Sequence, residues 1–160
     1  MPPPDTTVVR VPPGDTALLR RALARFGADP GTAPDAFAAA PGALAVVATT
    51  AEDLAGWCWG HLLPRPDGGR MAYLHHLEVA EPHRRRGIGR ALTEAFLEAA
   101  AHDGATRAFL TTGRANTAAR RLYESLGATP AAQGPTVNYW WSAIPCASGP
   151  AAPALPPPRR

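Results

Sequence analysis

The chain has 160 residues, of which 46% are hydrophobic, so it is long and apolar enough to fold as one domain around a single core. Its formal net charge of +3 includes 16 basic residues, all of them arginine, and this small, scattered excess excludes nucleic acid as an expected partner. Two distant cysteines, no apolar run of the ~18 residues that span a membrane, and no secretory pattern at the N-terminus together favour a soluble, cytoplasmic protein.

Both ends of the chain are low in sequence complexity. Residues 1–5 are rich in proline, and residues 145–160 combine proline and alanine with little to bury. Such segments are typically extended or flexible, so we expect both of them to lie outside the fold. The predicted folded domain therefore spans residues 6–144.

The first half of this domain alternates between strand-like and helix-like patterns. Thr6–Val11 is predicted to form a short strand, closed by Pro12-Pro13. Asp15 is a suitable N-cap for a helix that continues to about Phe26, with an apolar face. The next expected elements are a short helix at Pro34–Ala40 and strands at Ala43–Thr49, Leu54–Leu63 and Met71–Ala80.

The second half contains two stronger helical patterns. Ile88–His102 is amphipathic, Asn116–Leu126 follows it, and a glycine lies just beyond each. Strands are expected at Thr106–Thr111 and Thr136–Ser142. This order of elements predicts an α/β fold with a central sheet of mixed strand direction.

The stretch His83–Leu92, HRRRGIGRAL, has no evident packing role. Gly87 and Gly89 weaken the start of a helix, and three consecutive arginines repel one another. A bound anion explains both features, because the first N–H groups of a helix lack partners and glycine lets a phosphate approach the backbone. The spacing matches neither a dinucleotide fingerprint nor a P-loop. The stretch therefore predicts a phosphate or pyrophosphate site of another kind.

Three stretches occur in order within compatible elements: Leu77–Val79 in a strand, Arg84–Gly89 before a helix, and Asn116–Gly127 in the next helix. The second follows the pattern R-x-x-G-x-G, and the third follows N-x-x-A-x-x-x-Y-x-x-x-G. Together they resemble the motifs of the GNAT superfamily of N-acetyltransferases. The resemblance implies a mixed, mostly antiparallel central sheet with a splayed fourth strand, flanked by helices. It also implies acetyl-CoA as co-substrate.

The resemblance assigns coenzyme contacts to residues in all three stretches. The N–H of Val79 is the expected donor to the thioester carbonyl oxygen, where negative charge develops. Tyr123 stands where the family carries its general acid, and a phenol can protonate a departing thiolate; the alternative role is packing against the helix stripe. The expected coenzyme-binding residues are Leu77, Glu78, Val79, Arg84, Arg85, Arg86, Gly87, Ile88, Gly89, Arg90 and Asn116.

The sequence leaves the general base open. Many family members have an acidic residue where Thr111 stands, and a threonine cannot take a proton at neutral pH. His75 is one candidate, because Tyr73-Leu74-His75 resembles the His-x-His pair of arylalkylamine N-acetyltransferases. A histidine in a central strand is also often a hydrogen-bonded core residue. Glu78 and water are the other candidates.

Strand alternation predicts how the side chains around His75 divide between the two faces of the sheet. The adjacent His75 and His76 should point in opposite directions, which argues against a shared metal ion. No other ligand cluster is evident, so we expect no metal site. The face of His75 should also carry Tyr73, Leu77 and Val79, and the other face should carry His76 and Glu78.

The acceptor is less defined than the donor. The stretches ALARFG (22–27), HLLPRPDGGRM (61–71) and VAEPHRRRGIGRAL (79–92) are similar to the aminoglycoside 3-N-acetyltransferase branch. This resemblance makes an aminoglycoside-type antibiotic the first expectation. A polycationic sugar needs carboxylates, and the available ones are Asp29, Asp35, Asp67 and Glu78. An apolar or aromatic amine would instead use a hydrophobic pocket, for which the candidates are Trp57, Trp59, Trp140 and Trp141, unless these cover a sheet face.

We therefore expect an acetyl-CoA-dependent N-acetyltransferase acting on a primary amine of a small molecule. The alternatives are an enzyme that acetylates a protein N-terminus or lysine, and a non-catalytic acyl-CoA sensor. The presence of both Tyr123 and Asn116 counts against the sensor. Many relatives pair through C-terminal strands, and Tyr139-Trp140-Trp141 makes a homodimer a further expectation. No nucleic-acid or membrane partner is expected.

Overall fold

The computed structural model describes residues 2–27, 34–51, 53–132 and 134 of the chain. The chain divides into two compact units, residues 1–128 and 129–160, and all helices and strands of the described residues belong to the first unit. The strand expected at Thr136–Ser142, the C-terminal aromatic residues and the segment 145–160 lie outside the described residues.

The elements of the first unit follow the order that the sequence predicts, and their ends agree with the expected ones to within one residue. Capping explains two of the helix starts. The Asp15 side chain accepts hydrogen bonds from the N–H groups of Ala17 and Leu18, and the Asn116 side chain accepts one from Ala119. The elements are β1 Thr7–Arg10, α1 Thr16–Arg25, α2 Asp35–Ala39, β2 Ala43–Thr49, β3 Leu54–Pro64, β4 Arg70–Val79, the 3₁₀ turn η1 Glu81–His83, α3 Ile88–His102, β5 Arg107–Leu110 and α4 Thr117–Ser125.

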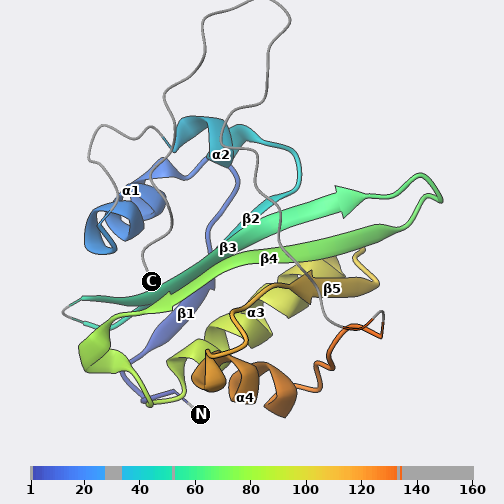
Figure 1. Ribbon diagram of the computed structural model, residues 1–160. Coiled ribbons are helices and arrows are strands. Elements are labelled where there is room, and N and C mark those ends of the chain that lie inside the picture. The colour runs from blue at the N-terminus through green and yellow to red at the C-terminus, as the bar shows by residue number, and fades with distance from the viewer. Residues whose placement is uncertain (1, 28–33, 52, 133, 135–160) are drawn as a thin grey trace, which may run out of the picture. The chain divides into compact units, whose positions relative to one another are not determined.

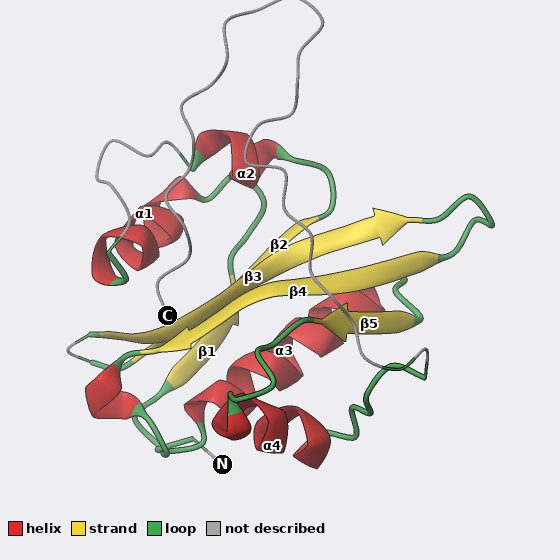
Figure 2. Ribbon diagram, in the orientation of Figure 1, coloured by secondary structure: helices red, strands yellow, loops and turns green. Residues whose placement is uncertain are grey.

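The described strands form one sheet in the order β1-β2-β3-β4-β5, as Figure 2 shows. Neighbouring strands are antiparallel except β4 and β5, which run parallel. β4 pairs with β5 only from Met71 to Leu74, so the second half of β4 diverges from its neighbour. The expected mixed, mostly antiparallel sheet with a splayed fourth strand is confirmed.

Helices cover both faces of this sheet (Figure 1). On one face α3 packs against β2, β3 and β4, and the core consists of Leu44, Val46, Cys58, Ile88, Leu92 and Phe96, each at most 2% exposed. On the other face α1 and α2 cover a second core of Leu19, Ala22, Ala45, Val47, Leu54 and Trp57. Cys58 is a buried thiol, and burial raises its pKa to about 12.

β4 carries a β-bulge at His75 that its sequence pattern does not predict. Trp59 of β3 pairs with His76, but the next β3 residue, Gly60, pairs with Leu74. His75 is therefore one extra residue on β4, and the alternation of side chains restarts after it. Gly60 permits this close pairing, because a Cβ at that position would clash with the β4 backbone.

The bulge makes two expectations about β4 wrong. Leu77 and Val79 pack on the α3 face, whereas His75 contacts Trp59 on the α1–α2 face, so these side chains do not share a face. His75 and His76 do not point in opposite directions either. Both imidazole rings lie near the Trp59 ring, with centroid distances of 4.3 and 6.3 Å. One extra residue shifts the two-residue period of a strand, and this shift explains both departures.

Candidate active site

The divergence of β4 from β5 coincides with a cleft of about 750 Å³, which we call the splay cleft. β4 and the loop before α3 line it from one side, and the end of β5 and α4 line it from the other. Of the thirteen site residues expected from the sequence, eleven line this cleft. The exceptions are Arg86, which is exposed, and Ile88, whose side chain is buried in the α3 core. Ile88 therefore offers the cleft no side chain.

Leu77 and Val79 present backbone groups to the splay cleft. The N–H of Ala80 donates to the Ala55 carbonyl oxygen at 2.9 Å, and residues that bond across an antiparallel pair alternate along each strand. The backbone of Glu78 therefore bonds toward β3, and the N–H groups of Leu77 and Val79 point away from β3 to the side where β5 has diverged. An N–H in this position can stabilise negative charge on a carbonyl oxygen.

The loop before α3 has the backbone of an anion-binding nest. Arg85 has a φ of 62°, the one positive φ of a non-glycine residue in the described chain, and Gly87 follows with a φ of 80°. Left-handed residues turn successive N–H groups toward one concavity. No described side chain caps the start of α3, so its first N–H groups and the helix dipole face the loop. This geometry supports the anion site that the arginines and glycines predict.

The three arginines that line the cleft differ in their partners. Arg84 donates from Nε to the Val79 carbonyl oxygen at 3.0 Å, and both Arg84 and Arg85 are exposed. Arg90 forms an ion pair with Glu94 at 2.9 Å and donates to the Ser125 hydroxyl at 3.1 Å. Arg90 therefore holds α4 against α3, and much of its charge is already balanced. Arg84 and Arg85 are the better placed cations for a phosphate.

α4 places Asn116 and Tyr123 at the cleft wall. Asn116 caps the helix by accepting the Ala119 N–H at 3.2 Å, which sets where the helix begins. Tyr123 is half-buried and packs against the α3 core. Burial, and then the neighbouring Cys58, raises the pKa of the Tyr123 phenol, so the hydroxyl is protonated at neutral pH. A protonated phenol at this wall can donate its proton to a leaving group.

His75 also lines the splay cleft, at the bulge of β4. Its Nδ1 lies 3.2 Å from the Tyr73 hydroxyl oxygen, and its ring meets Trp59 edge-on. Burial, and then the nearby His76 and His61, lowers the pKa of His75. The lowered pKa favours the neutral imidazole near pH 7, and a neutral imidazole has one ring nitrogen that can accept a proton.

A second hollow of about 410 Å³, which we call the apolar pocket, lies on the α1–α2 face of the sheet. The side chains that dominate its walls are Leu19, Leu23, Phe26, Phe37, Trp57 and Trp59. His76 and Glu78 line both the apolar pocket and the splay cleft, so the two hollows meet at β4. His76 Nε2 lies 3.2 Å from Glu78 Oε2 at this junction.

Sequence reasoning found only part of the apolar pocket. Trp57 and Trp59 were candidates for such a pocket, with cover of a sheet face as the alternative, and an apolar face was predicted for α1. Phe37 and His76 were missed. Phe37 lies in a five-residue helix with no clear apolar face, and His76 reaches the pocket only because the bulge shifts the register. No local signal in the sequence marks either position.

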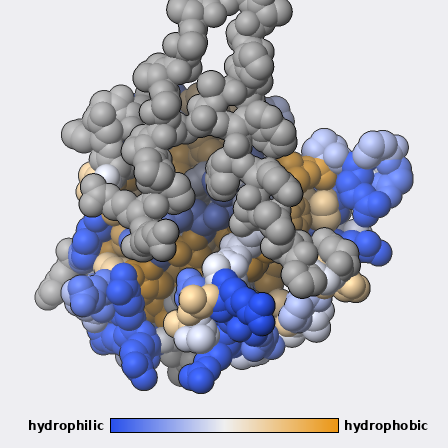
Figure 3. Space-filling view, in the orientation of Figure 1, coloured by the Kyte–Doolittle hydropathy of each residue, from blue (hydrophilic) through white to orange (hydrophobic). Residues whose placement is uncertain are grey.

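The surface of the described residues separates apolar from polar side chains. On the face seen in Figure 3, hydrophobic residues lie across the middle, and hydrophilic residues lie along the lower edge and at the tip of the β3–β4 hairpin. No group of three or more His, Cys, Asp or Glu side chains in the described residues is arranged to hold a metal ion. None of the described helices is both long and apolar enough to cross a membrane.

Comparison with known proteins agrees with this architecture. The sequence model of the Acetyltransferase (GNAT) family matches residues 16–128, most of the chain. No curated protein matches the chain in sequence. Among solved structures, an aminoglycoside acetyltransferase from an uncultured soil metagenomic sample is similar with a TM-score of 0.69 and 26% identity, over 84% of this chain and 99% of that chain.

Two further structures share the fold at lower identity. A ribosomal-protein-alanine N-acetyltransferase from Brucella melitensis biovar Abortus 2308 has a TM-score of 0.62 and 24% identity, over 84% of this chain and 99% of that chain. An aminoglycoside N-acetyltransferase in complex with CoA has a TM-score of 0.66 and 16% identity, over 85% and 93%. With the splayed β4 and the three motifs at one cleft, the family match leads to one conclusion: the chain belongs to the GNAT family of acetyltransferases.

Proposed function

We propose that this protein transfers the acetyl group of acetyl-CoA to the primary amine of a small molecule. Acetyl-CoA is the donor general to the GNAT family, and its thioester supplies an activated acyl group. One observation carries the proposal: the Val79 backbone, the nest at Arg85 and Gly87, and the Tyr123 side chain all line the same cleft. A donor polarised by the strand, anchored by the loop and protonated on sulfur by the phenol needs these three groups together.

The residues of the splay cleft fit such a donor. A diphosphate is matched by the free N–H groups at the start of α3 and by the cations of Arg84 and Arg85. The backbone groups of Leu77 and Val79 that point away from β3 match an amide-containing chain lying along the strand. Asn116 lines the same wall through its capped helix end.

The proposed reaction forms one N–C bond and breaks one C–S bond. A base first removes a proton from the ammonium group, and we assign this role to the neutral imidazole of His75, acting directly or through water. The amine nitrogen then attacks the thioester carbon while the Val79 N–H stabilises the negative charge on oxygen. Tyr123 gives its proton to the departing sulfur, and the second amine proton restores the phenol through water.

Thiol release is the direct test of this proposal. Purified protein is incubated with acetyl-CoA and with panels of aminoglycosides, other small amines and peptides, and acetyl-CoA binding is measured separately by calorimetry. Aminoglycosides belong in the panel because a structural neighbour carries that activity in its name. Turnover of any small amine supports the proposal. Turnover of peptides alone points to a protein acceptor, and coenzyme binding without turnover of any amine points to the sensor.

A further inference from the structure

Resting on this proposed function, we propose that the acceptor is a monoamine with an aromatic or similar apolar body. The body occupies the apolar pocket, and the ammonium group lies at Glu78. A polycationic sugar is a poor match for this pocket.

The walls of the apolar pocket offer contacts that suit a flat hydrophobic group. Phe26 and Trp57 are stacked, with ring centroids 6.1 Å apart and planes 9° apart. Phe37 meets Trp59 edge-on at 5.6 Å, with an angle of 82° between the planes. Aromatic rings favour both of these arrangements with a further ring, and burial of an apolar body adds hydrophobic free energy. A volume of about 410 Å³ is within the usual range for a small-molecule site.

The charges around the apolar pocket fit one cation. Glu78 is the one carboxylate among the described residues that line it. Asp35 and Asp67, two other acids considered for a polycation, line neither hollow; Asp35 accepts from Arg20 at 3.0 Å, and Asp67 pairs with Arg65 in the β3–β4 turn. Asp29 lies outside the described residues. Among the described residues, the charge at this pocket therefore matches a single ammonium group, which the nearby aromatic faces also attract.

The position of Glu78 connects this pocket to the reaction. Glu78 lines both hollows, and the next residue along β4, Val79, turns its N–H to the splay cleft. An ammonium group at Glu78 is therefore at the boundary between the apolar pocket and the cleft that we assign to the donor. His76, which lies 3.2 Å from the Glu78 carboxylate, and His75 border the same junction. A bound monoamine thus places its nitrogen, rather than its body, toward the thioester.

The test compares phenylethylamine, ethanolamine and a kanamycin-type aminoglycoside at saturating acetyl-CoA, using thiol release. We expect kcat/KM for phenylethylamine to exceed that for the other two by at least about tenfold. Trp59→Ala should raise the KM for phenylethylamine about tenfold and leave the Kd of acetyl-CoA unchanged. The matched control is Leu63→Ala, which removes a partly exposed side chain from the same strand outside both hollows.

The possible outcomes separate the two proposals. An aminoglycoside or ethanolamine used better than phenylethylamine overturns the acceptor assignment and leaves the acetyltransferase proposal standing. Phenylethylamine turnover that is insensitive to Trp59→Ala overturns the pocket assignment. The proposed function and this inference are both overturned if calorimetry detects no binding of acetyl-CoA, or if none of the tested amines causes thiol release.

Discussion

The side chain of Arg84 donates from Nε to the Val79 carbonyl oxygen at 3.0 Å, which fastens the loop before α3 to the end of the splayed strand. The same residue, Val79, turns its N–H to the splay cleft. The bond therefore couples the position of the proposed anion site to that of the proposed carbonyl donor. Arginine is suited to this task because one nitrogen can bond the strand while the others keep the positive charge at the cleft.

Replacing Arg84 by lysine should weaken coenzyme binding without removing the charge. Lysine has no Nε–H to donate to the Val79 carbonyl oxygen. The loop therefore loses a hydrogen bond that contributes about 1 kcal/mol to holding it in the binding conformation. We expect the Kd of CoA to rise about fivefold, measured by calorimetry. Arg121→Lys, on the exposed side of α4, is the control. An unchanged Kd for Arg84→Lys would show that the bond does not position the loop.

Much of the fold is predictable because local chemistry decides it. Asp15 and Asn116 cap the helices that follow them, and Gly87 takes the left-handed backbone at the start of α3. These signals lie within a few residues of the structure that they produce. The family motifs add the order of the elements, and the sheet follows from that order.

The junction between the two hollows could not be predicted in the same way. The bulge at His75 depends on which β3 residues oppose it, and Gly60 lies fifteen positions earlier in the chain. Alternation within β4 alone gives the wrong faces for Leu77 and Val79. The apolar pocket also depends on the packing of helices α1 and α2 against β3, which are separate in the sequence. The residues around Phe37 therefore give no indication of its role.

Gly60→Ala should strongly destabilise the protein. A Cβ at this position would lie 1.9 Å from the Tyr73 carbonyl oxygen and 2.9 Å from Phe96 Cζ, so the strands or α3 must move. Overpacking of this kind costs about 1–3 kcal/mol or more in the free energy of unfolding. Gly113→Ala is the matched control, because a Cβ there meets nothing within 4 Å. Urea denaturation of both variants measures the difference, and equal stability would contradict the tight pairing at the bulge.

Tyr123→Phe tests the proposed general acid. The raised pKa of this phenol keeps it protonated through neutral and mildly alkaline pH, so the wild type should hold its kcat there. Removing the hydroxyl should lower kcat about a hundredfold and leave the Kd of acetyl-CoA nearly unchanged, since the ring still packs against the core. Steady-state kinetics and calorimetry separate the two quantities. A variant with wild-type kcat would remove Tyr123 from the mechanism.

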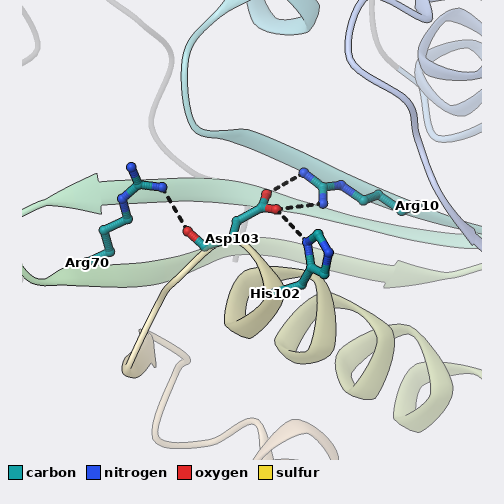
Figure 4. A network of polar contacts seen from close by, with 4 residues as sticks. All are labelled: Arg10, Arg70, His102 and Asp103. Carbon is teal, nitrogen blue, oxygen red and sulfur yellow. Dashed lines mark hydrogen bonds and ion pairs between the residues drawn. The ribbon is translucent and has the colours of Figure 1, made fainter.

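Asp103 ties the end of α3 to the first strand (Figure 4). Its carboxylate accepts from both terminal nitrogens of Arg10, with 3.1 Å between Nη1 and Oδ1, and its backbone carbonyl accepts from Arg70. The Arg10 hydrogen bond, and then that of His102, holds the pKa of the Asp103 carboxyl below its usual value. The pair therefore stabilises the fold above the unfolded-state pKa of about 3.9, and this contribution is lost as pH falls through the folded-state pKa.

Asp103→Asn should consequently have a pH-dependent effect. The side chains of Arg10 and Asp103 are both partly exposed, so we expect the substitution to lower the free energy of unfolding by about 1 kcal/mol or less at pH 7. The difference from wild type should shrink from pH 7 to pH 2, as falling pH protonates the carboxyl first in the unfolded state and then in the folded state. Urea denaturation at the two pH values measures it. A difference that persists unchanged in acid would assign the effect to packing and not to charge.

His75→Gln tests the proposed base through the pH profile. Partial burial and then the neighbouring His76 and His61 lower the pKa of His75, so its neutral form persists to lower pH than that of an isolated histidine. For the wild type we expect kcat/KM to fall in acid with an apparent pKa below about 6.5. The variant should lose this step and about a hundredfold in kcat/KM at pH 7, and His102→Gln, on the exposed end of α3, should keep both. If the step stays in His75→Gln, the proton goes to another group at the junction, and Glu78 is the next one to replace.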